Sequence, residues 1–100
     1  MSSPERELVL SPQAEADLTD ILQYTLETWG EAQLATYAGV LDEALRLLRD
    51  NPQIGFTRPA VSERHRFLPA GEHVIAYRLT PTRIEVSRIL HGRMDLKRNL

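Results

Sequence analysis

The sequence predicts an α+β domain of two layers, in which an N-terminal strand and an antiparallel helix hairpin pack on an antiparallel sheet. One short apolar run is followed by two segments with helical spacing of their apolar residues, and the second half holds three runs with strand character. The expected order is therefore β-α-α-β-β-β. One hundred residues, of which 42% are hydrophobic, suit a single small domain over residues 1–100, with a short charged tail from about residue 92.

The first half predicts a strand and two helices. Residues 7–10 form the strand, and Ser11-Pro12 supplies an N-cap followed by a proline at the first helical position. Gly30 can take a positive φ and end the first helix, and a second helix is expected over residues 31–49. The connection is so short that the helices must run antiparallel. The two apolar faces comprise Ala14, Leu18, Ile21, Leu22, Thr25 and Trp29, and then Leu34, Tyr37, Ala38, Leu41, Leu45 and Leu48.

The second half predicts a loop and a meander of three strands. Residues 51–63 are rich in proline and glycine, and Ile54 and Phe56 are expected to pin this loop to the core. Strands are expected over residues 64–69, 73–79 and 83–90, joined by turns at residues 70–72 and 80–82. Counting directions along the chain makes the first strand antiparallel to the last, so that the two can pair. The helices then cover one face of the sheet, and no segment is left to cover the other.

Composition bounds the compartment and the partners. The chain has no cysteine, begins with charged residues and contains no apolar run of membrane-spanning length, so we expect a soluble cytoplasmic protein. The net charge of −2 hides an asymmetry. Residues 1–50 carry ten acidic and three basic residues, whereas residues 51–100 carry four acidic and nine basic ones. The basic half favours an anionic partner surface, although the two halves can also attract each other within the fold.

Several kinds of active site are excluded by spacing. The three histidines, His65, His73 and His91, show no helical ligand spacing, so no metal site is expected. There is no Gly-x-Ser-x-Gly elbow for a serine hydrolase and no glycine-rich phosphate loop after a strand. We therefore expect no cofactor.

Arginines on the meander are the main candidates for a recognition surface. An arginine in an otherwise apolar strand register needs an anion, a bulge that turns it outward, or an uncovered sheet face. Each one taken singly fits a solvated residue, whereas a cluster on adjacent strands favours a binding surface. The candidate residues for binding a partner or target are Arg64, Arg66, Arg78, Arg88, His91, Arg93 and Asp95.

The C-terminal stretch "RILHGRMD" is open to more than one interpretation. His91 has an imidazole suited to general acid catalysis of RNA cleavage, but a lone histidine at a strand end is more often hydrogen-bonded structure. Asp95 can orient His91 or cap the tail, and Arg93 and Asp95 are expected on a departing tail that is free to meet a partner. Tyr77 is expected in the core. We interpret the stretch as a recognition element.

Four stretches together resemble the ParE toxins of the RelE/ParE superfamily of type II toxin–antitoxin systems. They are "SPQAEADLTDILQYTLETWG", "NPQIG", "HVIAYRL" and "IEVSRILHGRMD". The resemblance covers nearly the whole chain and implies a toxin that inhibits DNA gyrase, with no catalytic chemistry. It also implies neutralisation by a ParD-like antitoxin of the ribbon-helix-helix type in a hetero-oligomer, with DNA contacted only through the antitoxin.

Two alternatives remain open at this point. A RelE-like ribosome-dependent mRNA endoribonuclease would use Arg66, Arg88 and His91, but such enzymes employ several basic residues and a proton-transfer group, and the only lysine here is Lys97. A non-toxic module that binds a helical peptide on the uncovered sheet face is the other. The slightly acidic net charge also departs from the positive charge common among these toxins.

Overall fold

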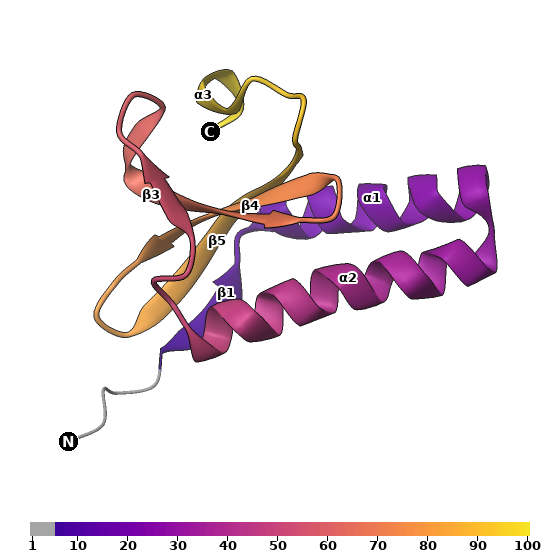
Figure 1. Ribbon diagram of the computed structural model, residues 1–100, viewed down its shortest axis with the longest axis horizontal. Coiled ribbons are helices and arrows are strands. Elements are labelled where there is room, and N and C mark those ends of the chain that lie inside the picture. Colours follow the sequence, from indigo (N-terminus) through magenta and orange to yellow (C-terminus); the bar gives the residue numbers. More distant parts are fainter. Residues whose placement is uncertain (1–5) are drawn as a thin grey trace.

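The computed structural model describes residues 6–100 and shows a helix hairpin packed against a twisted sheet (Figure 1). In the described range no helix is long and apolar enough to cross a membrane. The predicted α+β class and the order of the predicted elements are confirmed. The elements are β1 (Glu7–Leu10), α1 (Pro12–Trp29), α2 (Glu31–Asp50), β2 (Phe56–Arg58), β3 (Ser62–Ala70), β4 (His73–Leu79), β5 (Arg83–His91) and α3 (Leu96–Asn99).

The helix hairpin begins and ends where the sequence predicts. The Ser11 side chain accepts a hydrogen bond from the Ala14 N–H (3.0 Å), and Pro12 stands at the first helical position. Gly30 takes φ 90° between the helices, a conformation that residues with a Cβ rarely adopt. Trp29, by contrast, was expected on the buried face and is 68% exposed, because the last turn of α1 extends beyond the sheet (Figure 1).

The five strands form one mixed sheet in the order β1-β5-β4-β3-β2. β3, β4 and β5 make the predicted antiparallel meander. β1 pairs with β5 in the parallel sense, with Leu8 opposite Ile84 and Leu10 opposite Val86. The prediction that these strands are antiparallel was therefore wrong.

A short strand inside the predicted loop explains this error. β2 runs antiparallel to β3 at the sheet edge, so the chain reverses direction once more between α2 and the meander. That extra reversal makes β5 run the same way as β1. The loop is also not pinned as expected, because Ile54 and Phe56 are 45% and 41% exposed.

The main core lies between the hairpin and one face of the sheet. Its buried side chains come from both layers: Ala14, Leu41, Ala44, Leu48, Ala70, Ile75, Tyr77, Ile84, Val86 and Ile89. Tyr77 is a core residue, as predicted, and it is fully buried. Its hydroxyl donates to the Pro52 carbonyl (2.8 Å) and accepts from the Gly55 N–H (2.8 Å), which fastens the loop after α2 to the middle of the sheet.

The second face of the sheet is not left entirely bare. Phe67, Ala76 and Leu90 alternate with core residues along their strands, yet all three are buried. The C-terminal segment turns back on this side, and Arg88 Nη1 donates to the Asn99 carbonyl (2.9 Å). In Figure 1, α3 lies on the opposite side of the strands from the hairpin. The expectation that no segment covers this face is therefore wrong for its β5 end.

The double hydrogen bond of Tyr77 generates the first prediction. Tyr77→Phe should lower the free energy of unfolding by about 1–3 kcal/mol, because it leaves the Pro52 carbonyl and the buried Gly55 N–H without their partner. Urea titration followed by circular dichroism measures the loss. Tyr24→Phe, at a side chain that is 64% exposed, is the matched control and should change stability by less than about 0.5 kcal/mol. Equal stability of the two variants would contradict the anchoring role.

Candidate functional site

The side chain of Arg88 is bound by other residues of the same chain. Its Nε and Nη2 donate to the two carboxylate oxygens of Asp17 on α1 at 2.8 and 3.0 Å, and the side chains of Arg88 and Asp17 are only 27% and 16% exposed. Val86 pairs with Tyr77 while Arg88 pairs with Ala76, so Ser87 is an extra residue in the ladder. This bulge turns Arg88 away from the face of Val86. From the sequence, an arginine in this apolar register was expected to need an anion or a bulge. Arg88 has both, namely the Asp17 carboxylate and the bulge at Ser87.

Asp17 also binds the strand backbone. The Ile89 N–H donates to Asp17 Oδ2 at 3.0 Å, beyond the point where β1 has ended as the neighbouring strand of β5. Burial alone would raise the pKa of Asp17, but hydrogen bonds from Arg88 and Ile89 and the charge of Arg88 outweigh it and hold the pKa below its usual 3.8. The same pairing raises the pKa of Arg88.

Arg66 is likewise occupied. Its Nη1 donates to the carbonyls of Gln53 (3.2 Å) and Gly55 (2.9 Å), so the side chain braces the loop after α2. Arg66 and Arg88, both expected at a binding surface, therefore have structural partners. Their role in binding stays a prediction.

The remaining candidates are more open to solvent. Arg64 and Arg93 are exposed, and Arg78 makes a loose ion pair with Glu85 at 3.4 Å. Asp95 caps α3 by accepting from the Arg98 N–H (3.3 Å), which decides between the two roles expected for it. His91 accepts from the Arg93 N–H at Nδ1 (3.1 Å).

The candidate nuclease residues do not converge. Arg66 lies opposite Tyr77, and His91 lies opposite His73, which comes four positions before Tyr77 on β4. At about 3.3 Å per residue and about 5 Å per strand, their backbones are roughly 13 Å apart along the sheet and about 10 Å across it. Arg88 points to the other face and is paired. No single reacting atom can contact all three.

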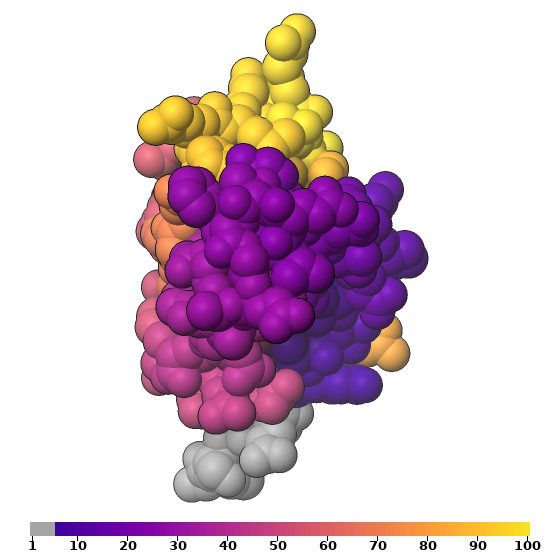
Figure 2. Space-filling view, turned by 90° about the vertical axis from the view of Figure 1, so that its right-hand side faces the viewer, coloured from indigo at the N-terminus to yellow at the C-terminus, as the bar shows by residue number. Residues whose placement is uncertain are grey.

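A groove runs between the end of the helix hairpin and the edge formed by the β3–β4 turn and the end of β5. Its volume is about 860 Å³. Figure 2 looks onto the hairpin end, with the C-terminal segment directly above it. Below, we call it the hairpin groove; it is lined by Asp20, Ile21, Tyr24, Thr25, Trp29, Gln33, Tyr37, Gly71, Glu72, His73 and His91.

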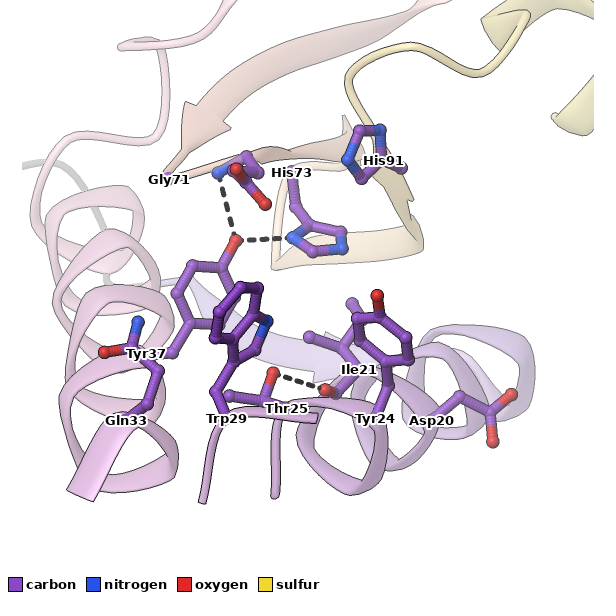
Figure 3. A pocket seen from close by; sticks show the side chains of 11 residues that line it. Asp20, Ile21, Tyr24, Thr25, Trp29, Gln33, Tyr37, Gly71, His73 and His91 are labelled. Carbon is purple, nitrogen blue, oxygen red and sulfur yellow. Dashed lines mark hydrogen bonds between the residues drawn. The ribbon is translucent and has the colours of Figure 1, made fainter. Parts of the chain in front are cut away.

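Tyr37 organises the inner wall of the hairpin groove (Figure 3). Its hydroxyl accepts from the Glu72 N–H (3.0 Å) and is hydrogen-bonded to Nδ1 of His73. Gly71 takes φ 58° in the turn, and a Cβ there would lie 2.7 Å from the Tyr37 ring, so this position needs glycine. α2 and the β3–β4 turn are thereby fixed to each other.

Two imidazoles meet at this wall. The rings of His73 and His91 lie edge to face, with centroids 5.4 Å apart. Burial lowers the pKa of His73, the charge of His91 lowers it further, and Glu72 opposes both. Burial also raises the pKa of Tyr37. His73 is therefore neutral at neutral pH.

Sequence reasoning missed most of this groove. Trp29 and Tyr37 were assigned to apolar helix faces and His73 to a strand, Tyr24 was assigned to no face, and only His91 was a candidate site residue. The available signal was the pair Tyr24 and Trp29, two large aromatics at the end of a helix, beside a very short connection.

Comparison with known proteins gives the class of the fold. A solved chain described as "Chromosomal ParDE TA system from P. aeruginosa" superimposes with a TM-score of 0.75 at 20% identity, covering 87% of this chain and 96% of that one. A chain of the E. coli DinJ–YafQ toxin–antitoxin complex superimposes with a TM-score of 0.54 at 16% identity, covering 87% and 92%. The fold is thus one found in toxin–antitoxin complexes.

Sequence similarity then gives the family. Residues 8–96 match the family model described as the ParE toxin of the type II toxin–antitoxin system parDE. Toxin ParE1 of Mycobacterium tuberculosis H37Rv is 40% identical over 93 residues, covering 92% of this chain and 95% of the relative. Toxin ParE1 of Caulobacter vibrioides is 34% identical over 91 residues, covering 91% and 94%. The chain belongs to the ParE toxin family of type II toxin–antitoxin systems.

The Asp17–Arg88 pair generates a pH-dependent prediction. Asp17→Asn should lower the free energy of unfolding by about 2 kcal/mol at pH 7, because it weakens hydrogen bonds between charged groups. A depressed carboxylate pKa contributes stability that is present above the unfolded value, near 3.9, and is lost as pH falls through the folded value. The difference between wild type and variant should therefore shrink below about pH 4.

Chemical unfolding at several pH values between 7 and 2.5 measures this difference. The control is Asp42→Asn, which removes an exposed ion pair with Arg46. It should cost less than about 1 kcal/mol at pH 7. A constant Asp17→Asn difference over the whole pH range would show that the carboxylate charge is not what stabilises the junction.

Proposed function

We propose that this ParE-family toxin stops growth by inhibiting DNA gyrase in the cytoplasm, without cleaving RNA, and that a ParD-like antitoxin with a ribbon-helix-helix domain neutralises it. The family match over residues 8–96 carries the proposal. The gyrase target and the antitoxin type come from the family resemblance alone.

The placement of the candidate catalytic groups supports a non-nucleolytic mechanism. Arg88 is bound by Asp17 and Asn99, Arg66 braces a loop, and His91 lies far from Arg66 along the sheet. A general acid and its cationic helpers must reach one scissile phosphate together. The ribonuclease alternative requires these side chains to leave their partners.

Gyrase and translation assays test the target. Purified toxin should block gyrase supercoiling or trap cleaved DNA, and it should leave mRNA intact when added to translating ribosomes. His91→Gln is the informative variant. If the protein were a nuclease with His91 as general acid, the substitution would slow cleavage by roughly 10²–10⁴-fold.

Under our proposal, any loss of toxicity in His91→Gln should follow a loss of stability or of target affinity. Specific cuts in ribosome-bound mRNA that vanish with His91→Gln would instead establish the ribonuclease. Normal growth upon expression of the chain without its antitoxin would favour the non-toxic binding module.

Antitoxin binding should stabilise the toxin. A partner at 100- to 1,000-fold its dissociation constant adds about 3–4 kcal/mol to a protein that it binds only when folded. For a domain of this size the melting temperature should rise by more than about 10 °C. Calorimetry of the toxin with and without the antitoxin measures this rise, and coincident melting curves would contradict the proposed neutralisation.

The exposed basic residues of the meander and the tail are the surface that we propose for acidic groups of a partner. Arg64, Arg78 and Arg93 can be reversed in charge without removing a partly buried contact, whereas reversal at Arg66 or Arg88 removes hydrogen bonds that hold the loop after α2 or the Asp17 carboxylate. Charge reversal at the first three should slow association and weaken its salt dependence.

A further inference from the structure

The helix hairpin has a one-sided charge. Between Pro12 and Leu45 it carries seven acidic residues and no lysine or arginine. Asp17 is neutralised by Arg88 and Asp42 by Arg46, which leaves Glu15, Asp20, Glu27, Glu31 and Glu43 without an ion-pair partner in the described residues. A partner segment that lies along this hairpin meets a negative potential.

The hairpin groove is the place where this potential meets exposed aromatic surface. Trp29 and Tyr24 are 68% and 64% exposed, and they stand on α1 facing the inner wall formed by Tyr37 and His73 (Figure 3). Among the large hydrophobic side chains of the described residues, these two are the most exposed, and grouped exposed apolar surface marks a binding site. The faces of aromatic rings attract cations. Carboxylates close to the rings strengthen this attraction.

Carboxylates stand at both ends of the groove. Asp20 lies at the α1 end, beside Tyr24 (Figure 3), and Glu72 lies in the β3–β4 turn. Glu72 is close enough to His73 and to Tyr37 for its charge to act on the pKa of each. Neither Asp20 nor Glu72 makes a salt bridge in the described residues.

We propose that the hairpin groove binds an arginine or lysine side chain of a partner polypeptide, with the alkyl part against Trp29 and Tyr24 and the cationic head toward Glu72. Charge complementarity selects this occupant, because the groove offers aromatic faces and carboxylates and, among residues 6–100, its two imidazoles are the only basic groups lining it. Arg93 lies in a smaller adjoining hollow with Glu72 and His91.

This proposal adds a contact site to the neutralisation by an antitoxin proposed above. It rests on that proposed function only for the identity of the partner. It also adds to the expectation from the sequence that the basic half of the chain favours an anionic partner surface. A segment that enters the groove needs a basic residue among the apolar ones.

Matched peptides test the site. The probes are acetylated, amidated tripeptides Leu-Arg-Leu, Leu-citrulline-Leu and Leu-Glu-Leu, titrated into the purified ¹⁵N-labelled chain at pH 7.5. Citrulline has nearly the shape of arginine but no charge. We expect the arginine peptide to shift the Trp29 indole and the Gly71 and His73 amide signals, the citrulline peptide to bind about 5- to 10-fold more weakly, and the glutamate peptide to cause no saturable shift.

Two glutamate variants separate local contact from overall charge. Glu72→Gln keeps the backbone N–H that binds Tyr37, so the wall stays in place, and it should weaken the arginine peptide about 2- to 5-fold. Glu43→Gln removes the same charge from the exposed side of α2, outside the groove, and should leave the affinity unchanged.

Acidification supplies a third arm. The titratable groups nearest His73 are the Tyr37 hydroxyl, Glu72 and His91. Asp20 and Tyr24 of α1 line the same groove, and Arg93 lies beyond His91. Protonation of His73 places a positive charge in the groove, so the arginine peptide should bind more weakly at pH 5.5 than at pH 7.5. His73→Gln should reduce that pH dependence.

Equal affinities of the arginine and citrulline peptides, equal effects of the two glutamate variants, or shifts that map outside the groove would each overturn the proposal. These results would leave the proposed function untouched, because that is judged by gyrase inhibition and by stabilisation with the antitoxin. If the toxin binds the arginine peptide but does not inhibit gyrase, the proposed function is overturned and the groove proposal stands.

Discussion

The carboxylate of Asp17 is the contact on which the arrangement of the layers depends. One side chain on α1 accepts from the guanidinium of Arg88 and from the backbone N–H of Ile89, and the same guanidinium donates to the Asn99 carbonyl. The helix layer, the fifth strand and the C-terminal segment are thus joined at one partly buried point. Hydrogen bonds between ionised groups are stronger than neutral ones and are directional, so this junction holds α1 in place against β5.

The sequence predicted the elements that local chemistry determines. The Ser11-Pro12 start, the Gly30 stop and the β4 boundaries depend on residues a few positions apart, and these predictions are confirmed. β2 was missed because three residues between two proline-containing turns carry no measurable periodicity. Its pairing with β3 depends on residues elsewhere in the chain. Because this reversal of the chain was missed, β1 was predicted to run antiparallel to β5.

The candidate site was predicted less well for a related reason. Strand parity gave the faces of the arginines, but the bulge at Ser87 shifts every later residue of β5 by one, and no single residue announces a bulge. The arginines were also judged without their partners. Arg88 and Asp17 are 71 positions apart. Tyr37 and His73, which form the groove wall, are 36 apart, so only the fold brings them together.

The two edges of the sheet limit how another chain can attach to it. β2 is three residues long with a register shift beside Arg58, and β1 is four residues long and begins with Glu7. Short, irregular, charged edges are poor templates for a further strand. Beyond β1, the Asp17 carboxylate occupies the Ile89 N–H that a neighbouring strand would use. The backbone therefore offers little for strand addition, and recognition between this toxin and other chains falls to its side chains.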